Sequence, residues 1–81
     1  MIIEVCGPGC AKCHATIKNV QKVVKELGLE HEIEVAEVKD ITTFSTKGVL
    51  LTPGVVINGI KVSEGRIPNT EEVKKWVKER R

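Results

Sequence analysis

The segment GVVINGIKV, residues 54–62, limits the fold more than any other part of the chain. A run of branched apolar residues ends at Asn58-Gly59, and a second short apolar run follows. Asn-Gly readily takes the positive φ angles of a two-residue turn, so the segment predicts an antiparallel hairpin with strands over residues 54–57 and 60–62. In a chain of 81 residues, which buries only roughly 60% of its unfolded surface, every other apolar stretch must share one core with this hairpin.

A strand, a helix and a second strand are predicted before the hairpin. Residues 2–6 (IIEVC) form an apolar run that stops at a Gly-Pro-Gly segment, which is typical of a buried strand. From residue 11 to Gly28 apolar residues recur with helical spacing, so an amphipathic helix is expected there. Residues 31–38 alternate between polar and apolar, which favours a strand. The side chains expected to face the core are Cys13, Ile17, Val20, Val23, Val24 and Leu27 of the helix and Ile33, Val35 and Val38 of the second strand.

Two further helices are predicted on either side of the hairpin. Asp40 is placed to cap a short helix over residues 41–47. Asn69 and Glu72 resemble a capping box at the start of a helix over residues 70–81. The core residues expected from these two helices are Phe44, Val73, Trp76 and Val77.

The order of the elements is therefore β-α-β-α-β-β-α, an α/β fold. A strand-helix-strand start implies a parallel pair joined by a right-handed crossover. The hairpin adds antiparallel strands to that pair. We expect a four-stranded mixed sheet flanked by helices, in one domain that spans residues 1–81.

Composition excludes several classes of function. The chain has one Trp, one Phe and no Tyr, so it lacks the aromatic side chains on which single-stranded nucleic acids stack. A net charge of +2 is too small to indicate a polyanionic partner. No segment approaches the ~20 apolar residues of a membrane span, and the N-terminal MIIEVC does not resemble a signal peptide. We expect a monomer in the cytoplasm, with no nucleic acid or membrane partner, where thiols are held reduced.

The segment GPGCAKCH, residues 7–14, carries the chemistry. Cys10 falls just before the first helical turn, and Cys13 falls one turn inside it on the apolar face. The partial positive charge and unpaired N–H groups of a helix N-terminus favour a thiolate on Cys10, and Lys12 adds a cation nearby. His14 is either a solvated helix residue or a second group that tunes this thiolate. Cys10 is thus the predicted nucleophile, and Cys13 is the predicted resolving thiol that attacks the mixed disulfide.

A strand followed by C-x-x-C at the start of a helix, with a Thr-Pro step before a hairpin, resembles thioredoxin and glutaredoxin. The sequence is most similar to the very small thioredoxin-like redox-active disulfide proteins, which carry GCAKC, a TP step and VING. The resemblance implies a protein-disulfide oxidoreductase without a bound cofactor, reduced again by a flavin-dependent thioredoxin reductase. It also implies that Pro53 is cis and faces the thiols, and that Thr52 contacts the backbone of the substrate.

The chain departs from the typical pattern of this family at the motif itself. Gly9 stands where typical thioredoxins have a Trp, and Ala11-Lys12 replaces Gly-Pro between the cysteines. No residue can be matched from the sequence to the buried, proton-handling aspartate of thioredoxin.

A metal-binding module is the principal alternative. Thiolates select soft ions such as Cu(I), and the C-x-x-C thiols resemble the ligands of ferredoxin-like copper chaperones. Cys6, Cys10, Cys13 and His14 together could also supply four zinc ligands. Those chaperones end on a strand, whereas this chain is predicted to end on a helix, which favours the oxidoreductase and no metal.

Two smaller alternatives concern the same cysteines. CAKCH matches the haem-attachment pattern with His14 as axial ligand, but the only methionine that could serve as a second ligand is Met1. Cys6 ends an apolar strand and is interpreted as a small buried core residue; the alternative is a third thiol that exchanges with Cys10.

Overall fold

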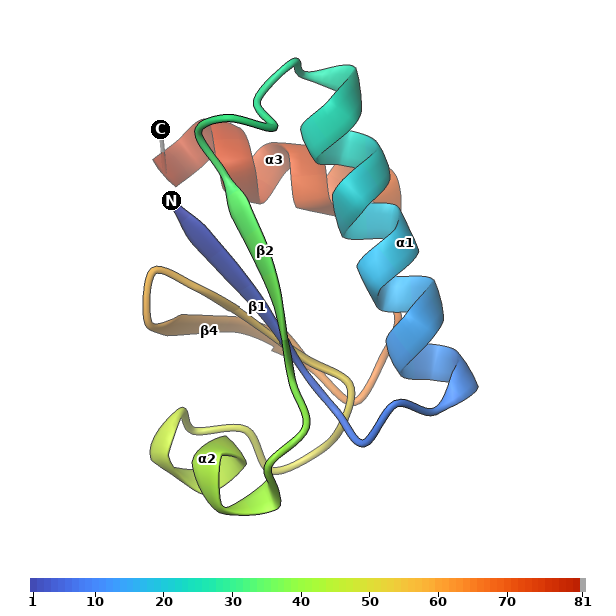
Figure 1. Ribbon diagram of the computed structural model, residues 1–81, viewed down its shortest axis with the longest axis vertical. Helices are drawn as coiled ribbons and strands as arrows, with labels where there is room; N and C mark the ends of the chain where they lie inside the picture. The colour runs from blue at the N-terminus through green and yellow to red at the C-terminus, as the bar shows by residue number, and fades with distance from the viewer. Residues whose placement is uncertain (81) are drawn as a thin grey trace.

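The seven elements occur in the order that the sequence predicts (Figure 1). The structure is a computed structural model that describes residues 1–80, apart from the side chain of Ile41. The elements are β1 (Ile2–Cys6), α1 (Ala11–Glu26), β2 (Glu34–Val38), α2 (Ile41–Thr46), β3 (Gly54–Ile57), β4 (Ile60–Glu64) and α3 (Thr70–Arg80).

The four strands form one mixed sheet in the order β2-β1-β3-β4. β1 and β2 are parallel, with Ile3 opposite Val35, so α1 is the crossover between them. β3 is antiparallel to both β1 and β4. Asn58 has a φ of 50° and Gly59 a φ of 83°, as the predicted hairpin turn requires. The predicted mixed sheet is therefore confirmed.

Two strands differ in length from the prediction. β2 begins at Glu34 rather than at residue 31, because the N–H groups of Glu32 and Ile33 both donate to the carbonyl of Leu29 and hold that stretch in a turn. β4 continues to Glu64, two residues further than predicted. A bulge opposite the Val55–Val56 step lets β4 continue beside β3.

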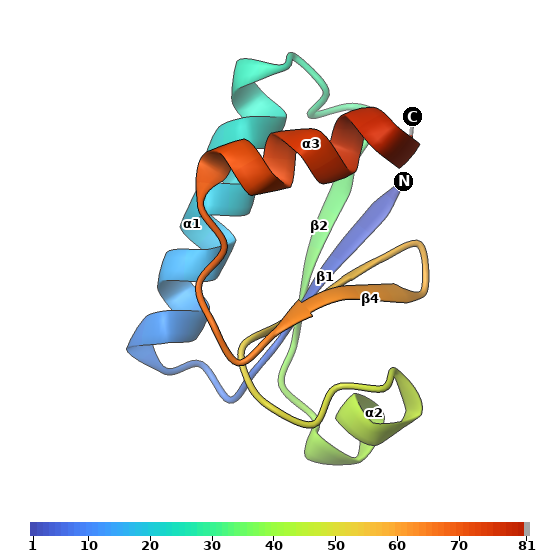
Figure 2. The same cartoon turned by 180° about the vertical axis from the view of Figure 1, so that it is seen from behind.

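Each face of the sheet has its own apolar cluster. The larger cluster fills the space between the sheet and the adjoining helices α1 and α3, which cross beside each other in Figures 1 and 2. The smaller cluster lies under α2 on the opposite face. The larger cluster contains Ile3, Val5, Val20, Val23, Val24, Leu29, Ile33, Val55, Ile57, Val73 and Val77, and the smaller one contains Cys6, Phe44, Val49 and Val56.

The predicted core faces are mostly confirmed, with differences at their margins. Ile17, Leu27, Val35, Val38 and Trp76 are only partly buried against the clusters. Thr16 was not expected in the core, yet it is fully buried. Its hydroxyl donates to the carbonyl of Lys12 at 2.8 Å, so α1 itself satisfies the buried oxygen.

The helices begin at the caps that the sequence predicts. The Asp40 carboxylate accepts the N–H of Thr42 at 3.0 Å and begins α2. At α3, the N–H of Glu72 donates to the Asn69 side chain at 2.9 Å, and the Glu72 carboxylate accepts the N–H of Asn69 at 3.3 Å. This reciprocal pair is the predicted capping box. Within residues 1–80, no helix combines the length and the apolar character that crossing a membrane requires.

Candidate active site

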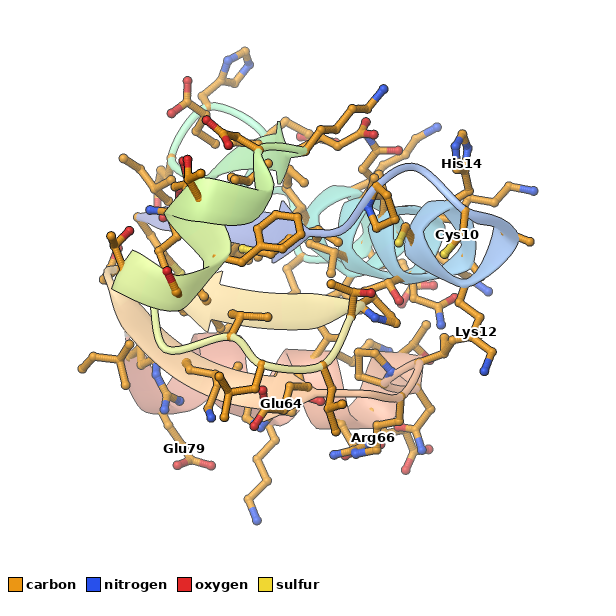
Figure 3. The ribbon with its side chains drawn as sticks, turned by 90° about the horizontal axis from the view of Figure 1, so that it is seen from below. Cys10, Lys12, His14, Glu64, Arg66 and Glu79 are labelled. Atoms are coloured by element: carbon orange, nitrogen blue, oxygen red, sulfur yellow. The ribbon has the colours of Figure 1, made fainter. Side chains whose placement is uncertain are left out.

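Cys10 lies where the chain turns from β1 into α1. The N–H of Gly7 donates to the carbonyl of Val38 at 2.8 Å and anchors the end of β1 to β2. Gly9 then takes a φ of 92°, which redirects the chain towards the helix at little steric cost. Cys10 occupies the N-cap of α1, and its side chain is exposed, with Lys12 and His14 extending on opposite sides of it (Figure 3). The predicted position of this thiol is confirmed.

The two cysteines of the motif face each other. Their Sγ atoms are 3.1 Å apart and both are free thiols. Cys13 is only 1% exposed, because it points from the first turn of α1 towards the sheet. Since a disulfide needs sulfur atoms about 2.05 Å apart, a small movement of the side chains closes the bond. The pair is therefore one exposed thiol backed by one buried thiol.

The surroundings of the two thiols shift their pKa values in opposite directions. The pKa of Cys10 is lowered, first by a hydrogen bond from the Cys13 side chain and then by the backbone N–H groups of Cys13 and Lys12. The pKa of Cys13 is raised, first by burial and then by its hydrogen bond to Cys10. A thiolate forms more readily on Cys10 while Cys13 keeps its proton, which suits two thiols that react in sequence.

Thr52 lies near this pair, and the peptide bond between Thr52 and Pro53 is cis, as the resemblance implies. The end of β1, the first turn of α1 and the Thr52–Pro53 segment meet closely at Gly7. A methyl group at Gly7 would collide with the Cys13 sulfur and would come within 3.9 Å of the Thr52 Cβ. Gly7 therefore gives room for Cys13 next to the Thr52–Pro53 segment.

Lys12 and His14 are exposed, and neither side chain makes a hydrogen bond or ion pair with another residue in the described part of the chain. The structure adds a third basic residue that the sequence analysis missed. A methyl group on Gly9 would lie 3.7 Å from Cε of Lys39 and 3.9 Å from Nε2 of His14. Lys39 follows β2 directly, so the parallel pairing of β1 and β2 could have indicated its place at this end of the sheet.

An apolar groove of about 440 Å³ extends from Pro8 of the motif to Thr52. Its walls come from the motif, from α2 and from the segment that precedes Pro53. Leu50 and Leu51 are 82% and 61% exposed, so their side chains leave apolar surface open to solvent along the groove. The groove is lined by Pro8, Phe44, Leu50, Leu51 and Thr52.

Glu64 is the main residue at the site that the sequence analysis did not find. Its Oε2 atom accepts the N–H of Leu50 at 2.8 Å and the N–H of Leu51 at 3.2 Å. The backbone bonds and Lys61 lower the pKa of Glu64 to about 2, with Lys61 as the largest cause. Local sequence carries no signal for these contacts, because they join residues 13 and 14 positions apart and depend on the bulge in β4.

Cys6 is fully buried in the smaller cluster, as its interpretation as a core residue requires. Burial and the charge of Glu4 raise its pKa, while Lys47 lowers it. Glu4 and Lys47 form a half-buried ion pair at 2.8 Å on the α2 side of the sheet. The sequence analysis did not identify Glu4 as a partly buried acid. Its ion-pair partner, Lys47, lies 43 residues further along the chain, at the end of α2.

Two observations bear on the metal alternative. The last described element is the helix α3, whereas the chaperone pattern ends on a strand. Within residues 1–80, no three His, Cys, Asp or Glu side chains gather where they could hold a metal ion.

Comparison with known proteins agrees with the geometry of the site. A family model described as a thioredoxin domain matches residues 1–78. The chain belongs to the thioredoxin family. A thioredoxin of Methanocaldococcus jannaschii is 42% identical over 79 residues, which cover 96% of this chain and 87% of that protein. A thioredoxin of Methanothermobacter thermautotrophicus is 36% identical over 75 residues, which cover 93% of this chain and 95% of that protein. This member of the thioredoxin family is a small thiol–disulfide oxidoreductase that acts on protein disulfides.

Proposed function

We propose that Cys10 is the nucleophile of this oxidoreductase and that Cys13 is its resolving thiol. The observation that carries the proposal is the asymmetry of the pair. Cys10 is exposed and its pKa is lowered, whereas Cys13 is buried, has a raised pKa and lies 3.1 Å from the Cys10 sulfur. Only Cys10 can therefore reach a partner's disulfide as a thiolate.

The reaction has two displacements at sulfur. The Cys10 thiolate attacks one sulfur of the substrate disulfide, forms a mixed disulfide and releases the other substrate sulfur as a thiolate. Cys13 then gives up its proton and attacks the Cys10 sulfur. The Cys10–Cys13 bond forms, and the second substrate sulfur leaves as a thiolate. The substrate gains two electrons, the pair loses two, and no bound cofactor is required.

Thr52 and Pro53 form the substrate-binding segment, in which the exposed Thr52 receives the substrate backbone and the fully buried Pro53 follows it. The backbone N–H and carbonyl of Thr52 make no hydrogen bond with any residue in the described chain, so they are open to an extended substrate segment. Lys12 and His14 support the thiolate as nearby basic groups that lack acidic partners within residues 1–80.

The proposal also covers the electron donor, the oligomeric state and the compartment of the protein. A flavin-dependent thioredoxin reductase returns electrons to the Cys10–Cys13 disulfide, and the protein works as a monomer of one domain. Its setting is the cytoplasm. Support comes from the C-x-x-C spacing of Cys10 and Cys13, which in a reducing compartment favours a catalytic pair over a structural disulfide.

Turnover of a disulfide-bonded protein, with a small dithiol as electron donor, tests the two roles. We expect Cys10→Ser to lose all turnover, because the hydroxyl is not ionised at neutral pH. We expect Cys13→Ser to lose turnover as well. Pre-reduced and then mixed with the substrate without the dithiol, which would itself cleave the product, it should accumulate a mixed disulfide between Cys10 and the substrate. Full turnover by Cys10→Ser, or failure of Cys13→Ser to trap any substrate, would overturn the assignment.

A further inference from the structure

The carboxylate of Glu64 ties the end of β4 to the segment that leads into Thr52 and Pro53 (Figure 3). One oxygen, Oε2, accepts the N–H groups of two consecutive residues, Leu50 and Leu51. We infer that Glu64 is a positioning residue for substrate binding, which holds the substrate-contacting segment against the thiols without touching the reacting sulfur atoms. This inference rests on the function proposed above.

The Glu64 carboxylate is oriented by its second oxygen. Oε1 accepts the ammonium group of Lys61 at 2.7 Å, while Oε2 remains directed at the two backbone N–H groups. Hydrogen bonds to an ionised acceptor are roughly twice as strong as neutral ones. Because the segment before Thr52 belongs to neither a helix nor a strand, these bonds replace the backbone pairing that regular structure would supply.

The residue after Glu64 adds a second connection to the same segment. The N–H of Gly65 donates to the carbonyl of Pro53 at 3.1 Å. Gly65 has a φ of 74°, and a methyl group there would lie 3.2 Å from the Leu51 side chain. Glu64 and Gly65 thus hold the segment at Leu50, Leu51 and Pro53, on both sides of Thr52.

The segment that Glu64 holds is connected to the thiols by contacts between neighbouring residues. Thr52 lies next to Gly7, and Gly7 lies against the Cys13 sulfur. Holding Leu50 and Leu51 in place therefore fixes where Thr52 presents its unpaired backbone groups relative to the cysteine pair. Without the carboxylate, the two N–H groups turn to water and the segment samples other conformations, so substrate binding pays a larger entropic cost.

Kinetics of Glu64→Ala with a disulfide-bonded protein test the inference, beside Lys61→Met as the matched control. Lys61→Met removes the ion pair at Oε1 but leaves both bonds at Oε2. We expect Glu64→Ala to raise KM about tenfold with kcat nearly unchanged, the scale of losing one hydrogen bond to a charged acceptor. The control should raise KM much less than Glu64→Ala does, because both hydrogen bonds at Oε2 remain. The rate and pH profile of Cys10 alkylation by a small reagent should be the same in all three proteins.

The outcomes separate this inference from the proposed function. An unmodified chain that fails to reduce the protein disulfide would refute the function itself. A chain that turns over, with an unchanged KM in Glu64→Ala, would refute only the role of Glu64. Equal rises in KM for both variants would assign the effect to the ion pair and overturn the inference. A loss of alkylation rate in parallel with the rise in KM would show general damage to the site and would overturn it as well.

If Glu64→Ala does not fold, Glu64→Gln takes its place. We expect Glu64→Gln to raise KM about threefold, because one neutral acceptor oxygen remains.

Discussion

At the scale of single residues, the chemistry depends on where each thiol stands relative to the start of α1. The same spacing that exposes Cys10 at the N-cap turns Cys13 into the core. The sequence was sufficient to predict this, because the helical periodicity places the two positions on different sides of the first turn. It was not sufficient to predict Glu64, whose contacts with Leu50 and Leu51 depend on the bulge in β4. Lys39 was missed although the predicted pairing of β1 with β2 could have indicated its place.

Replacing the buried thiol should change the acidity of the exposed one. We expect Cys13→Ala to raise the pKa of Cys10 towards its ordinary value of 9.0, because the side-chain hydrogen bond from Cys13 is the largest cause of the lowering. Thiolate absorbance or alkylation rate followed against pH measures the change. The Cys6→Ala variant is the control, and its titration of Cys10 should match that of the unmodified chain. A Cys10 titration that stays in place in Cys13→Ala would contradict the hydrogen-bond account.

Gly7 tests how tightly the site is packed. We expect Gly7→Ala to lower the free energy of unfolding by about 1–3 kcal/mol, the usual effect of inserting a methyl group into a filled space. Denaturant unfolding measures it. In a Cys13→Ala background the same substitution should cost clearly less, because the sulfur that the methyl group meets is gone. An equal cost in both backgrounds would show that the two residues do not compete for space.

At the scale of elements, local signals predicted the hairpin turn, α1 and both helix caps. Each of these depends on residues close together in sequence, such as Asn58 with Gly59 or Asn69 with Glu72. The beginning of β2 was predicted too early, because a turn closed by the Leu29 carbonyl overrides the alternating pattern. The extension of β4 was missed because a bulge leaves no distinct pattern in the sequence.

The capping box of α3 should make a measurable contribution to stability. We expect Asn69→Ala to lower the free energy of unfolding by about 1 kcal/mol, because the N–H of Glu72 loses its acceptor. Lys75→Ala, at an exposed position of the same helix, should leave it nearly unchanged. Equal unfolding midpoints for the two variants would refute the contribution of the cap.

At the scale of the whole molecule, four surface carboxylates within residues 1–80 have lowered pKa values: Glu26, Asp40, Glu64 and Glu72. For Glu64 the pKa falls from 4.5 to about 2. The unfolded chain binds these protons at a higher pH than the folded chain, so acid favours unfolding. We expect the urea midpoint to fall as the pH decreases from 4.5 towards about 2, and to fall less steeply in Glu64→Gln. A midpoint that rises or stays level over this range would contradict the account.

The two faces of the sheet also separate the three cysteines. Cys6 is enclosed in the cluster under α2, whereas Cys13 points from α1 beside Cys10. This separation supports our proposal that Cys10 and Cys13 are the electron-carrying pair, with Cys6 as a core residue.

Mapping the disulfide in the oxidised chain tests this claim most directly. Intact mass and peptide mapping, before and after dithiol reduction and alkylation, identify which sulfur atoms are joined and whether a metal ion is bound. The account predicts a metal-free chain with one reducible bond between Cys10 and Cys13, and with Cys6 alkylated as a free thiol once the chain is unfolded. A bond that includes Cys6, or a bound metal ion that shields the thiols from alkylation until a chelator is added, would contradict it.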